Sequence, residues 1–303
     1  MSKNKDAFLK LNVSKELSKK TSTSFIFSKE TKDAINKCYD EDNDIIIILK
    51  CIEHFSKINL FVITSEKLGI INSSLLLPFS FSYEEDNDIV TGDVAVELFG
   101  TSVVPENVYK LLIKIIEQIN TVLGTLIPNL QLEIFEYGKK YINSDKELGV
   151  QIEILSAREG SKISLSNESD GIKKIISILS AIIAMYNKKN ITVVVDELDA
   201  GIFEYLLGEI LEVLDKGTQG QLIFTSHNLR PLEKLNKDSI ICTTANPMCR
   251  YIRLENVKSN NNLRDFYLRG ISLGGQKEVI YEETNTFEIQ HALKLAGRVE
   301  NAN

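Results

Sequence analysis

Cysteine and histidine are scarce in this sequence, and neither is spaced as metal ligands usually are. The 303 residues include four cysteines and three histidines. No two cysteines have the CxxC spacing, and the histidines lie far from any cysteine-rich cluster; the residues are Cys38, Cys51, Cys242, Cys249, His54, His227 and His291. Structural zinc sites usually draw their ligands from such short spacings. We therefore expect no structural zinc site.

An excess of positive charge and a long apolar run are also missing. The chain has 35 basic and 42 acidic residues, a net charge of -7, so bulk charge does not suggest a nucleic-acid-binding protein, although a local basic face remains possible. The longest apolar run, within 175–186, is shorter than the ~20 residues that span a bilayer. Residues 1–20 are charged and polar, unlike a secretory leader. We expect a cytoplasmic, reduced protein without a membrane partner.

The fold of residues 1–100 is not settled by the sequence, and a chain of this length can form one large core or two modest ones. Residues 1–43 are rich in Lys, Ser, Thr and Asp without a sustained period, which predicts irregular or partly helical surface. The apolar runs 45–49 and 60–63 fit either buried strands or short helix segments.

Residues 101–163 have a clearer pattern, which predicts a helix followed by a β-hairpin arm. Pro105 suits the first turn of a helix, and the apolar residues after it fall on one helical face as far as Gly124. Residues 130–137 and 150–155 alternate apolar and polar side chains, as half-buried strands do.

Residues 164–270 read as strand, helix and strand, which predicts an α/β lobe with a parallel sheet and flanking helices. An apolar helix follows Gly171, and a continuous apolar strand follows at 191–195. A helix over 202–216 and a second strand over 221–225 come next. Unbroken apolar strands suit a parallel sheet that is covered on both faces. Further strands are expected at 239–243 and 250–254, and the tail 271–303 has helical character at 286–295.

Polar side chains follow both strands of this lobe. Asp196 and Glu197 come directly after the first strand, and Ser226 and His227 follow the second. Ligands bind at the carboxyl ends of the strands in a parallel sheet. A right-handed crossover between these two strands would bring their carboxyl ends to the same edge of the sheet. The alternative is structural: Asp196 and Glu197 would start the next helix, and His227 would be a polar loop residue.

A third feature is the turn Ser169-Asp170-Gly171, which opens the apolar helix. The amides at a helix N-terminus form an anion site, where a serine hydroxyl and a glycine amide can grip a phosphate. The alternative is that Ser169 or Asp170 simply caps the helix.

The order of these three features resembles the ABC-type ATPases of the SMC, RecF and OLD-like group, which includes bacterial AAA-family ATPases. Ser169-Asp170-Gly171 matches the signature loop, residues 193–197 match Walker B, Asp199 begins the D-loop, and His227 matches the switch histidine. The resemblance is strong over 164–232 and weaker as far as residue 270. It implies a P-loop NTPase-like lobe that uses ATP and Mg²⁺.

The resemblance also implies a role for each residue. Asp196 would orient Mg²⁺, Glu197 would activate the attacking water, and His227 would sense the γ-phosphate. Ser169 and Gly171, with Asp199, would contact nucleotide held by the partner protomer of an ATP-dependent dimer. DNA or a defence effector are the partners that the family suggests.

The P-loop that such an ATPase needs is missing from this sequence. No segment has the spacing GxxxxGK[ST], whose amides and lysine hold phosphates and whose hydroxyl holds Mg²⁺. We therefore expect the Walker A loop to come from another chain or from a missing N-terminus, with ATP hydrolysis only when it is supplied. The alternatives are a non-hydrolysing interaction and dimerisation module and an unrelated α/β binding domain.

Residues 272–276, SLGGQ, look more like the transporter signature than the turn at Ser169 does. They lie after Walker B and the histidine, and no apolar helix follows them closely. We predict a glycine turn there.

Overall fold

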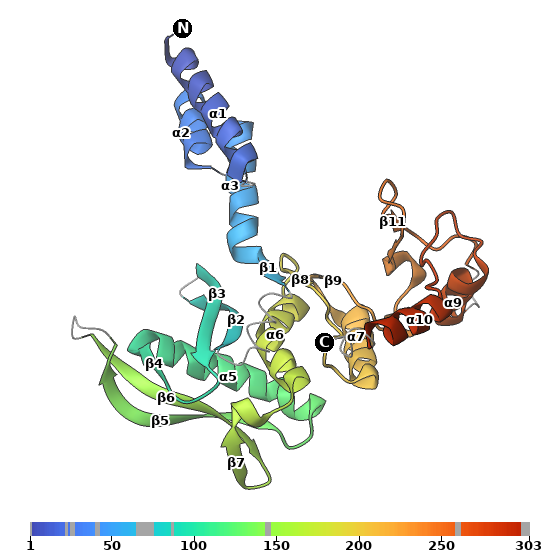
Figure 1. Ribbon diagram of the computed structural model, residues 1–303. Helices are drawn as coiled ribbons and strands as arrows, with labels where there is room; N and C mark the ends of the chain where they lie inside the picture. Colours follow the sequence, from blue (N-terminus) through green and yellow to red (C-terminus); the bar gives the residue numbers. More distant parts are fainter. Residues whose placement is uncertain are drawn as a thin grey trace, which may run out of the picture. The chain divides into compact units, whose positions relative to one another are not determined.

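The computed structural model describes residues 2–21, 24, 28–39, 43–64, 76–85, 88–142, 147–257 and 262–297. The chain forms two compact units. The first unit comprises residues 1–201 together with 218–225, and the second unit comprises residues 202–217 and 226–303. Figure 1 shows the helices and strands of both units. The domain ranges expected from the sequence, 1–100, 101–163, 164–270 and 271–303, stay a prediction.

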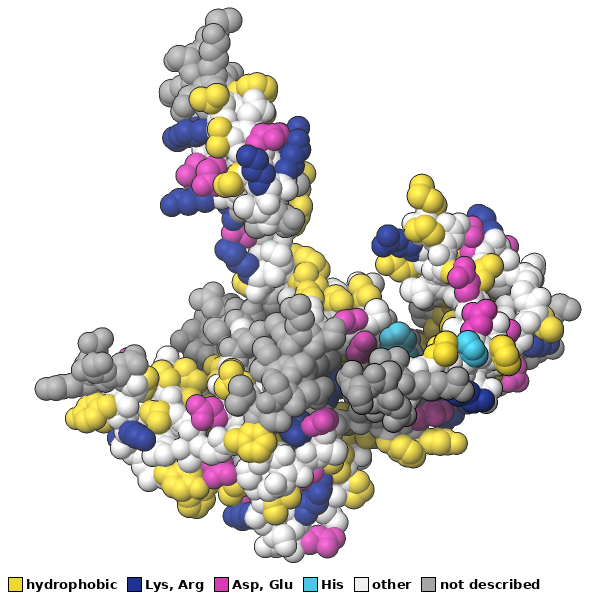
Figure 2. Space-filling model, in the orientation of Figure 1, with side chains coloured by type: hydrophobic (Ala, Val, Ile, Leu, Met, Phe, Trp, Pro, Cys, Tyr) yellow, Lys and Arg dark blue, Asp and Glu magenta, His cyan; other side chains and the backbone are white. Residues whose placement is uncertain are grey.

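Helices open the first unit: α1 (Ser2–Thr21), α2 (Lys29–Cys38), α3 (Asp44–His54) and the short π-helix η1 (Phe55–Asn59). The Asn43 side chain caps α3 by accepting a hydrogen bond from the Ile45 amide at 3.0 Å. The apolar run 45–49 is therefore helical, one of the two structures that its pattern allowed. Hydrophobic side chains remain exposed on these helices (Figure 2), among them Phe8 at 66% and Ile48 at 56%.

A parallel sheet forms the centre of the predicted α/β lobe. Its strands, in the order β1-β8-β9, are β1 (Leu60–Ile63), β8 (Thr192–Val195) and β9 (Gln221–Phe224). Alternate residues of β1 and β8 are buried: Phe61, Ile63, Val193 and Val195. Helix α6 (Asp170–Asn187), most of which is buried, contacts β8. The sheet and its helix confirm the predicted α/β class.

Antiparallel strands make up the rest of the first unit. Strands β2 (Leu76–Glu85) and β3 (Asp88–Glu97) form one hairpin. A second sheet has the order β4-β6-β5, with β7 paired to β6; its strands are β4 (Ser102–Pro105), β5 (Gln131–Tyr141), β6 (Leu148–Arg158) and β7 (Ser161–Ser164). Helix α5 (Glu106–Leu126) buries one apolar face, as predicted. The predicted β-hairpin is confirmed as β5 and β6.

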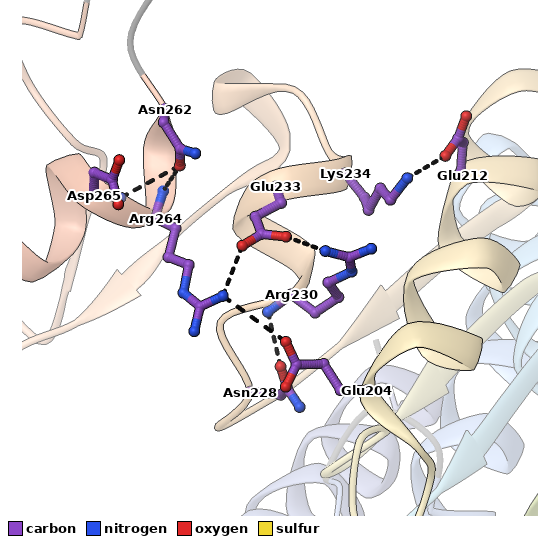
Figure 3. A network of polar contacts seen from close by, with 9 residues as sticks. All are labelled: Glu204, Glu212, Asn228, Arg230, Glu233, Lys234, Asn262, Arg264 and Asp265. Atoms are coloured by element: carbon purple, nitrogen blue, oxygen red, sulfur yellow. Dashed lines mark hydrogen bonds and ion pairs between the residues drawn. The ribbon is translucent and has the colours of Figure 1, made fainter.

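The second unit contains small elements joined by charged side chains. They are α7 (Glu204–Gly217), α8 (Pro231–Lys234), η3 (Lys237–Ser239), β10 (Cys242–Thr243), β11 (Tyr251–Ile252), α9 (Leu263–Leu273) and α10 (Thr286–Ala296). Glu233 of α8 pairs with Arg230 and, at 2.7 Å, with Arg264 of α9 (Figure 3). The hydrogen bond from Arg264 is the main cause that lowers the pKa of Glu233. This network links α8 to α9.

The SLGGQ segment lies at the end of α9, whose last residue is Leu273. Gly274 and Gly275 have φ angles of 71° and 91°, which glycine adopts at little cost. The two glycines follow the end of α9 in conformations that suit glycine, and a turn at these residues stays a prediction. None of the helices in the described part of the chain is both long enough and apolar enough to cross a membrane.

Gly220, the residue before β9, lies against the end of α6 in a space that excludes any side chain. Its amide donates to the Met185 carbonyl at 2.9 Å, and a Cβ atom at this position would lie 2.3 Å from the Ile191 carbonyl oxygen. Because backbone would have to move, we expect Gly220→Ala to lower the free energy of unfolding by about 1–3 kcal/mol or more. Urea unfolding followed by circular dichroism measures this loss.

The matched control is Gly124→Ala within α5, where an added Cβ atom would be 3.8 Å from its nearest neighbour, the Leu130 carbonyl. Alanine favours a helix interior over glycine by about 1 kcal/mol, so this variant should be neutral or more stable. Equal destabilisation by both substitutions would contradict the steric explanation.

Candidate functional site

Asp196 and Glu197 form the turn that leaves the carboxyl end of β8. The Asp196 amide extends the sheet by donating to the Ile63 carbonyl at 2.9 Å. Both acidic side chains are partly exposed. The next helix, α7, begins only at Glu204, so the alternative that these acids start that helix is wrong.

Thr225, the residue after β9, connects the two strand ends. Its hydroxyl donates to Oδ1 of Asp196 at 2.6 Å and accepts a hydrogen bond from the Glu197 amide at 2.7 Å. Its carbonyl accepts from the Leu198 amide at 2.9 Å. Thr225 therefore fixes both the Asp196 side chain and the backbone that carries Glu197. The sequence pattern identifies Thr225 only as the end of a strand; a hydroxyl residue at the same strand end as the acids is the signal for its role.

The turn after Glu197 is held from α6 by Lys174. Glu197 has a φ angle of 50°, in the left-handed region that few residues other than glycine adopt. The buried Lys174 ammonium donates to the carbonyl of Glu197 and, at 3.2 Å, to that of Ala200. Burial lowers the pKa of Lys174, whereas the nearby charge of Asp199 and then those of the other two acids raise it. Lys174 and its neighbour Lys173 are the two lysines of a largely apolar helix, and the motif pattern of the sequence gives Lys174 no role.

Replacing Lys174 with methionine should test this support. The change removes donors from two carbonyl groups, and we expect the free energy of unfolding to fall by about 1–3 kcal/mol. The measurement is urea unfolding, together with faster hydrogen exchange at the Leu198 amide.

Lys216→Met on α7 is the control, because its lysine is exposed and pairs with Glu212 on the surface. Such surface pairs contribute about 0–1 kcal/mol. A Lys174→Met loss no greater than that of Lys216→Met would show that Lys174 does not support the turn.

The Ser169-Asp170-Gly171 turn begins α6 and lies against the acidic turn. The Ser169 hydroxyl accepts a hydrogen bond from the Ile172 amide at 3.3 Å. Ser169 therefore caps the helix, which was the structural alternative to a phosphate-binding role. Gly201, with a φ angle of 78°, ends the acidic turn, and a Cβ atom there would be 3.2 Å from the Gly171 amide nitrogen. The two turns are therefore in direct contact.

A buried carboxylate fixes the chain immediately before Ser169. The Glu168 side chain is 4% exposed and pairs with Arg158 of β6 at 2.9 Å. It also accepts a hydrogen bond from the Ser156 hydroxyl. The antiparallel sheet thereby anchors the start of α6.

His227 belongs to the second unit, where it lies in the turn that follows β9, and its side chain is exposed. The structure thus brings together Ser169, Gly171, Asp196, Glu197 and Asp199 in the first unit. The predicted position of His227 beside Glu197 stays a prediction.

The carboxylate oxygens of the acidic turn are of the kind that binds Mg²⁺ in nucleotide sites, where the protein supplies few of the metal ligands. Within the described ranges, no three His, Cys, Asp or Glu side chains gather closely enough to hold a metal ion. Mg²⁺ in nucleotide sites usually takes one or two carboxylates, and water and phosphate oxygens complete its shell. The Asp196 carboxylate, partly exposed and oriented by Thr225, is a suitable single ligand.

About half of the chain is similar to a known protein family. Residues 85–232 match a family model described as "AAA domain, putative AbiEii toxin, Type IV TA system". Over this segment the chain is similar to that AAA-domain family. The segment contains the signature turn, the acidic turn and His227, and it ends at the residue where the resemblance seen in the sequence stops being strong.

Parts of solved structures of SMC heads are also similar to this chain. An SMC head bound to the C-winged helix domain of ScpA is 17% identical, with 41% of this chain and 38% of that chain covered and a TM-score of 0.30. A structure from work on ATP-driven dimerisation and DNA-stimulated activation of SMC ATPases is 14% identical, with 49% and 89% covered and a TM-score of 0.36. An Smc head from Pyrococcus furiosus, bound to the C-terminal domain of ScpA, is 16% identical, with 76% and 48% covered and a TM-score of 0.28. No curated protein matches the chain.

Proposed function

We propose that this chain supplies the Walker B acids and the signature surface of an ATP-hydrolysing, ABC-type assembly. The Walker A loop comes from another chain or from a segment outside this sequence. The observation that carries the proposal is the contact between the two turns: Gly171 and Gly201 touch, and Thr225 orients Asp196 beside them. Acidic and anion-binding groups are thereby combined in one small region.

Each group has a role that follows from its chemistry. Asp196 holds Mg²⁺, which supplies positive charge toward the phosphates when bound. Glu197 orients the attacking water and accepts its proton. His227 contacts the γ-phosphate.

The signature turn acts on nucleotide that is bound by the partner protomer. The amides at the start of α6 and the Ser169 hydroxyl face its phosphates, because a helix N-terminus favours anions. Asp199 completes the same surface. ATP therefore joins two protomers, and its hydrolysis separates them.

The cellular setting follows from the family description, which names a Type IV toxin–antitoxin system. It favours a cytoplasmic ATPase in a defence system, with an effector protein or DNA as its target.

A second candidate function is a non-hydrolysing interaction and dimerisation module. The absence of GxxxxGK[ST] spacing from all 303 residues favours it, since a chain without that loop has no lysine or amide cradle for the triphosphate.

Co-expression with a P-loop segment separates the two candidates. The segment is the strand, GxxxxGK[ST] loop and following helix of an AAA-domain family member, and its P-loop Lys→Ala variant is the control. We expect phosphate release with the intact segment and none with the control. A stable complex without turnover would favour the interaction module. Tight ATP binding by this chain alone would show that it has a phosphate site that the motif search missed.

A further inference from the structure

The turn that carries His227 is shaped by hydrogen bonds from its own side chains. The Ser226 hydroxyl accepts a hydrogen bond from the Asn228 amide at 3.1 Å, and Oδ1 of Asn228 accepts one from the Arg230 amide at 2.8 Å. Ser and Asn side chains commonly stabilise turns in this way. These bonds are local, so they shape the turn but do not attach it to the rest of the second unit.

The Arg230 side chain makes that attachment, because it lies against α7. Its guanidinium carbon is 4.5 Å from the centroid of the Tyr205 ring, which is a cation–π distance. Gly208 of the same helix leaves the space for it: a Cβ atom there would lie 2.7 Å from Nε of Arg230. Nε is buried and makes no hydrogen bond within the described part of the chain. Burying an unpaired donor costs stability, so other contacts must hold the side chain in this place.

Ion pairs fix the guanidinium group of Arg230. It pairs with Glu233 of α8, whose carboxylate also accepts a hydrogen bond from Arg264 of α9 at 2.7 Å (Figure 3). Arg264 in turn lies 3.9 Å from Glu204, at the start of α7. The side chains of Arg230 and Glu233 are 17% and 19% exposed, so solvent screens this pair less than it screens a fully exposed one. Arg230 thus belongs to the turn, to the surface of α7 and to the charged network of α8 and α9.

These contacts suit an arginine better than a lysine. A lysine could pair with Glu233, but the planar guanidinium lies against the Tyr205 ring and pairs with a carboxylate at the same time. His227 precedes Arg230 in the same turn, and its side chain is exposed. A side chain that contacts a reacting phosphate has to be held close to one position, which an exposed turn does not provide by itself. The contact with α7 supplies this support.

We propose that Arg230 is a positioning residue for His227. It holds the turn after β9 against α7 by stacking on Tyr205 beside Gly208 and by pairing with Glu233. The inference rests on the proposed contact of His227 with the γ-phosphate, and it adds the residue that keeps His227 in place. Arg230 acts through His227 and needs no contact of its own with the nucleotide.

Hydrogen exchange at the Asn228 amide measures how firmly the turn is held. Arg230→Met removes the guanidinium group, keeps a long side chain beside Gly208 and leaves Glu233 paired with Arg264. We expect the Asn228 amide to exchange about tenfold faster or more, because the turn can then open without the rest of the unit. Arg269→Met is the matched control: this exposed arginine of α9 lies 5.9 Å from the Phe266 ring, and its loss should leave Asn228 exchange unchanged.

Gly208→Ala tests the same contact from the side of α7. The added Cβ atom would displace Nε of Arg230, whereas alanine suits a helix better than glycine does. We expect faster Asn228 exchange in this variant too, with the helix content of the wild type by circular dichroism. An Asn228 amide that exchanges at the wild-type rate in both Arg230→Met and Gly208→Ala would overturn the inference.

A double-mutant cycle shows whether Arg230 acts through His227. In the assembly that is complemented with a P-loop segment, we expect Arg230→Met to lower kcat/KM for ATP by about tenfold and to add no further loss to His227→Ala. Arg230→Lys, which can still pair with Glu233, should recover part of the rate. A purely structural arginine would instead give the same loss with and without His227, and that result would overturn the inference.

The proposed function and the role of Arg230 fail separately. If the complemented wild-type assembly shows no turnover, the hydrolase proposal falls, and faster Asn228 exchange in Arg230→Met would still show that Arg230 holds the turn. If the wild type turns over and Arg230→Met lowers the rate equally in both backgrounds, the hydrolase proposal stands and the positioning role is wrong.

Discussion

Glu197→Gln is expected to reduce phosphate release by the P-loop-complemented assembly by about 100-fold or more. The amide keeps the shape and hydrogen-bonding capacity of the side chain, but it cannot accept the proton of the attacking water. ATP binding does not need this proton transfer, so ATP-dependent association should persist or become stronger. Steady-state phosphate release and sedimentation velocity with ATP measure the two effects.

Glu209→Gln is the control, because Glu209 is an exposed acid on α7 that has no part in the proposed site. Its turnover should equal that of the wild type. If Glu197→Gln also turned over at the wild-type rate, with the P-loop segment confirmed to be present, Glu197 would not be the catalytic base. The interaction module would then be the better account of the chain.

The sequence predicted those parts of the fold that depend on local periodicity. The stripe of apolar residues after Pro105 becomes the buried face of α5, and the bare apolar run that precedes Asp196 becomes β8. Burial of one helix face leaves a repeat of apolar residues in the sequence, and burial of a central strand leaves a short continuous apolar run. The parallel sheet followed because the helix between its last two strands has the length of a single crossover.

The contacts that shape the site could not be predicted in this way. Lys174 reaches the carbonyl of Glu197 from another element, and Thr225 reaches Asp196 from the neighbouring strand. These pairs are far apart in the sequence, and only the folded sheet and helix bring them together. The run 45–49 was ambiguous for a different reason, since five apolar residues fit a strand or a helix equally well. In the structure this run is helical, and the Asn43 side chain caps the helix.

Ser169 shows how a structural role and a functional role can share one residue. Its hydroxyl caps α6 by accepting a hydrogen bond from the Ile172 amide, and the N-terminus of a helix is also where a phosphate is favoured. A cap contributes about 0.5–2 kcal/mol, so substitutions here affect stability as well as any ligand. A small replacement that keeps the hydroxyl preserves the cap, whereas a bulky one also blocks the ligand, so the two substitutions separate the effect on stability from the effect on binding.

Ser169→Arg should prevent ATP-dependent association of the complemented assembly and abolish its turnover. A bulky side chain at the signature turn occupies the space of the partner's γ-phosphate, and its loss of the cap should cost about 1 kcal/mol of stability. Ser169→Thr is the control, because it retains a hydroxyl that can cap the helix and should retain association. Sedimentation velocity with ATP gives the oligomeric state, and circular dichroism confirms that both variants are folded. A folded Ser169→Arg variant that still associates on addition of ATP would show that this turn does not contact the partner's nucleotide.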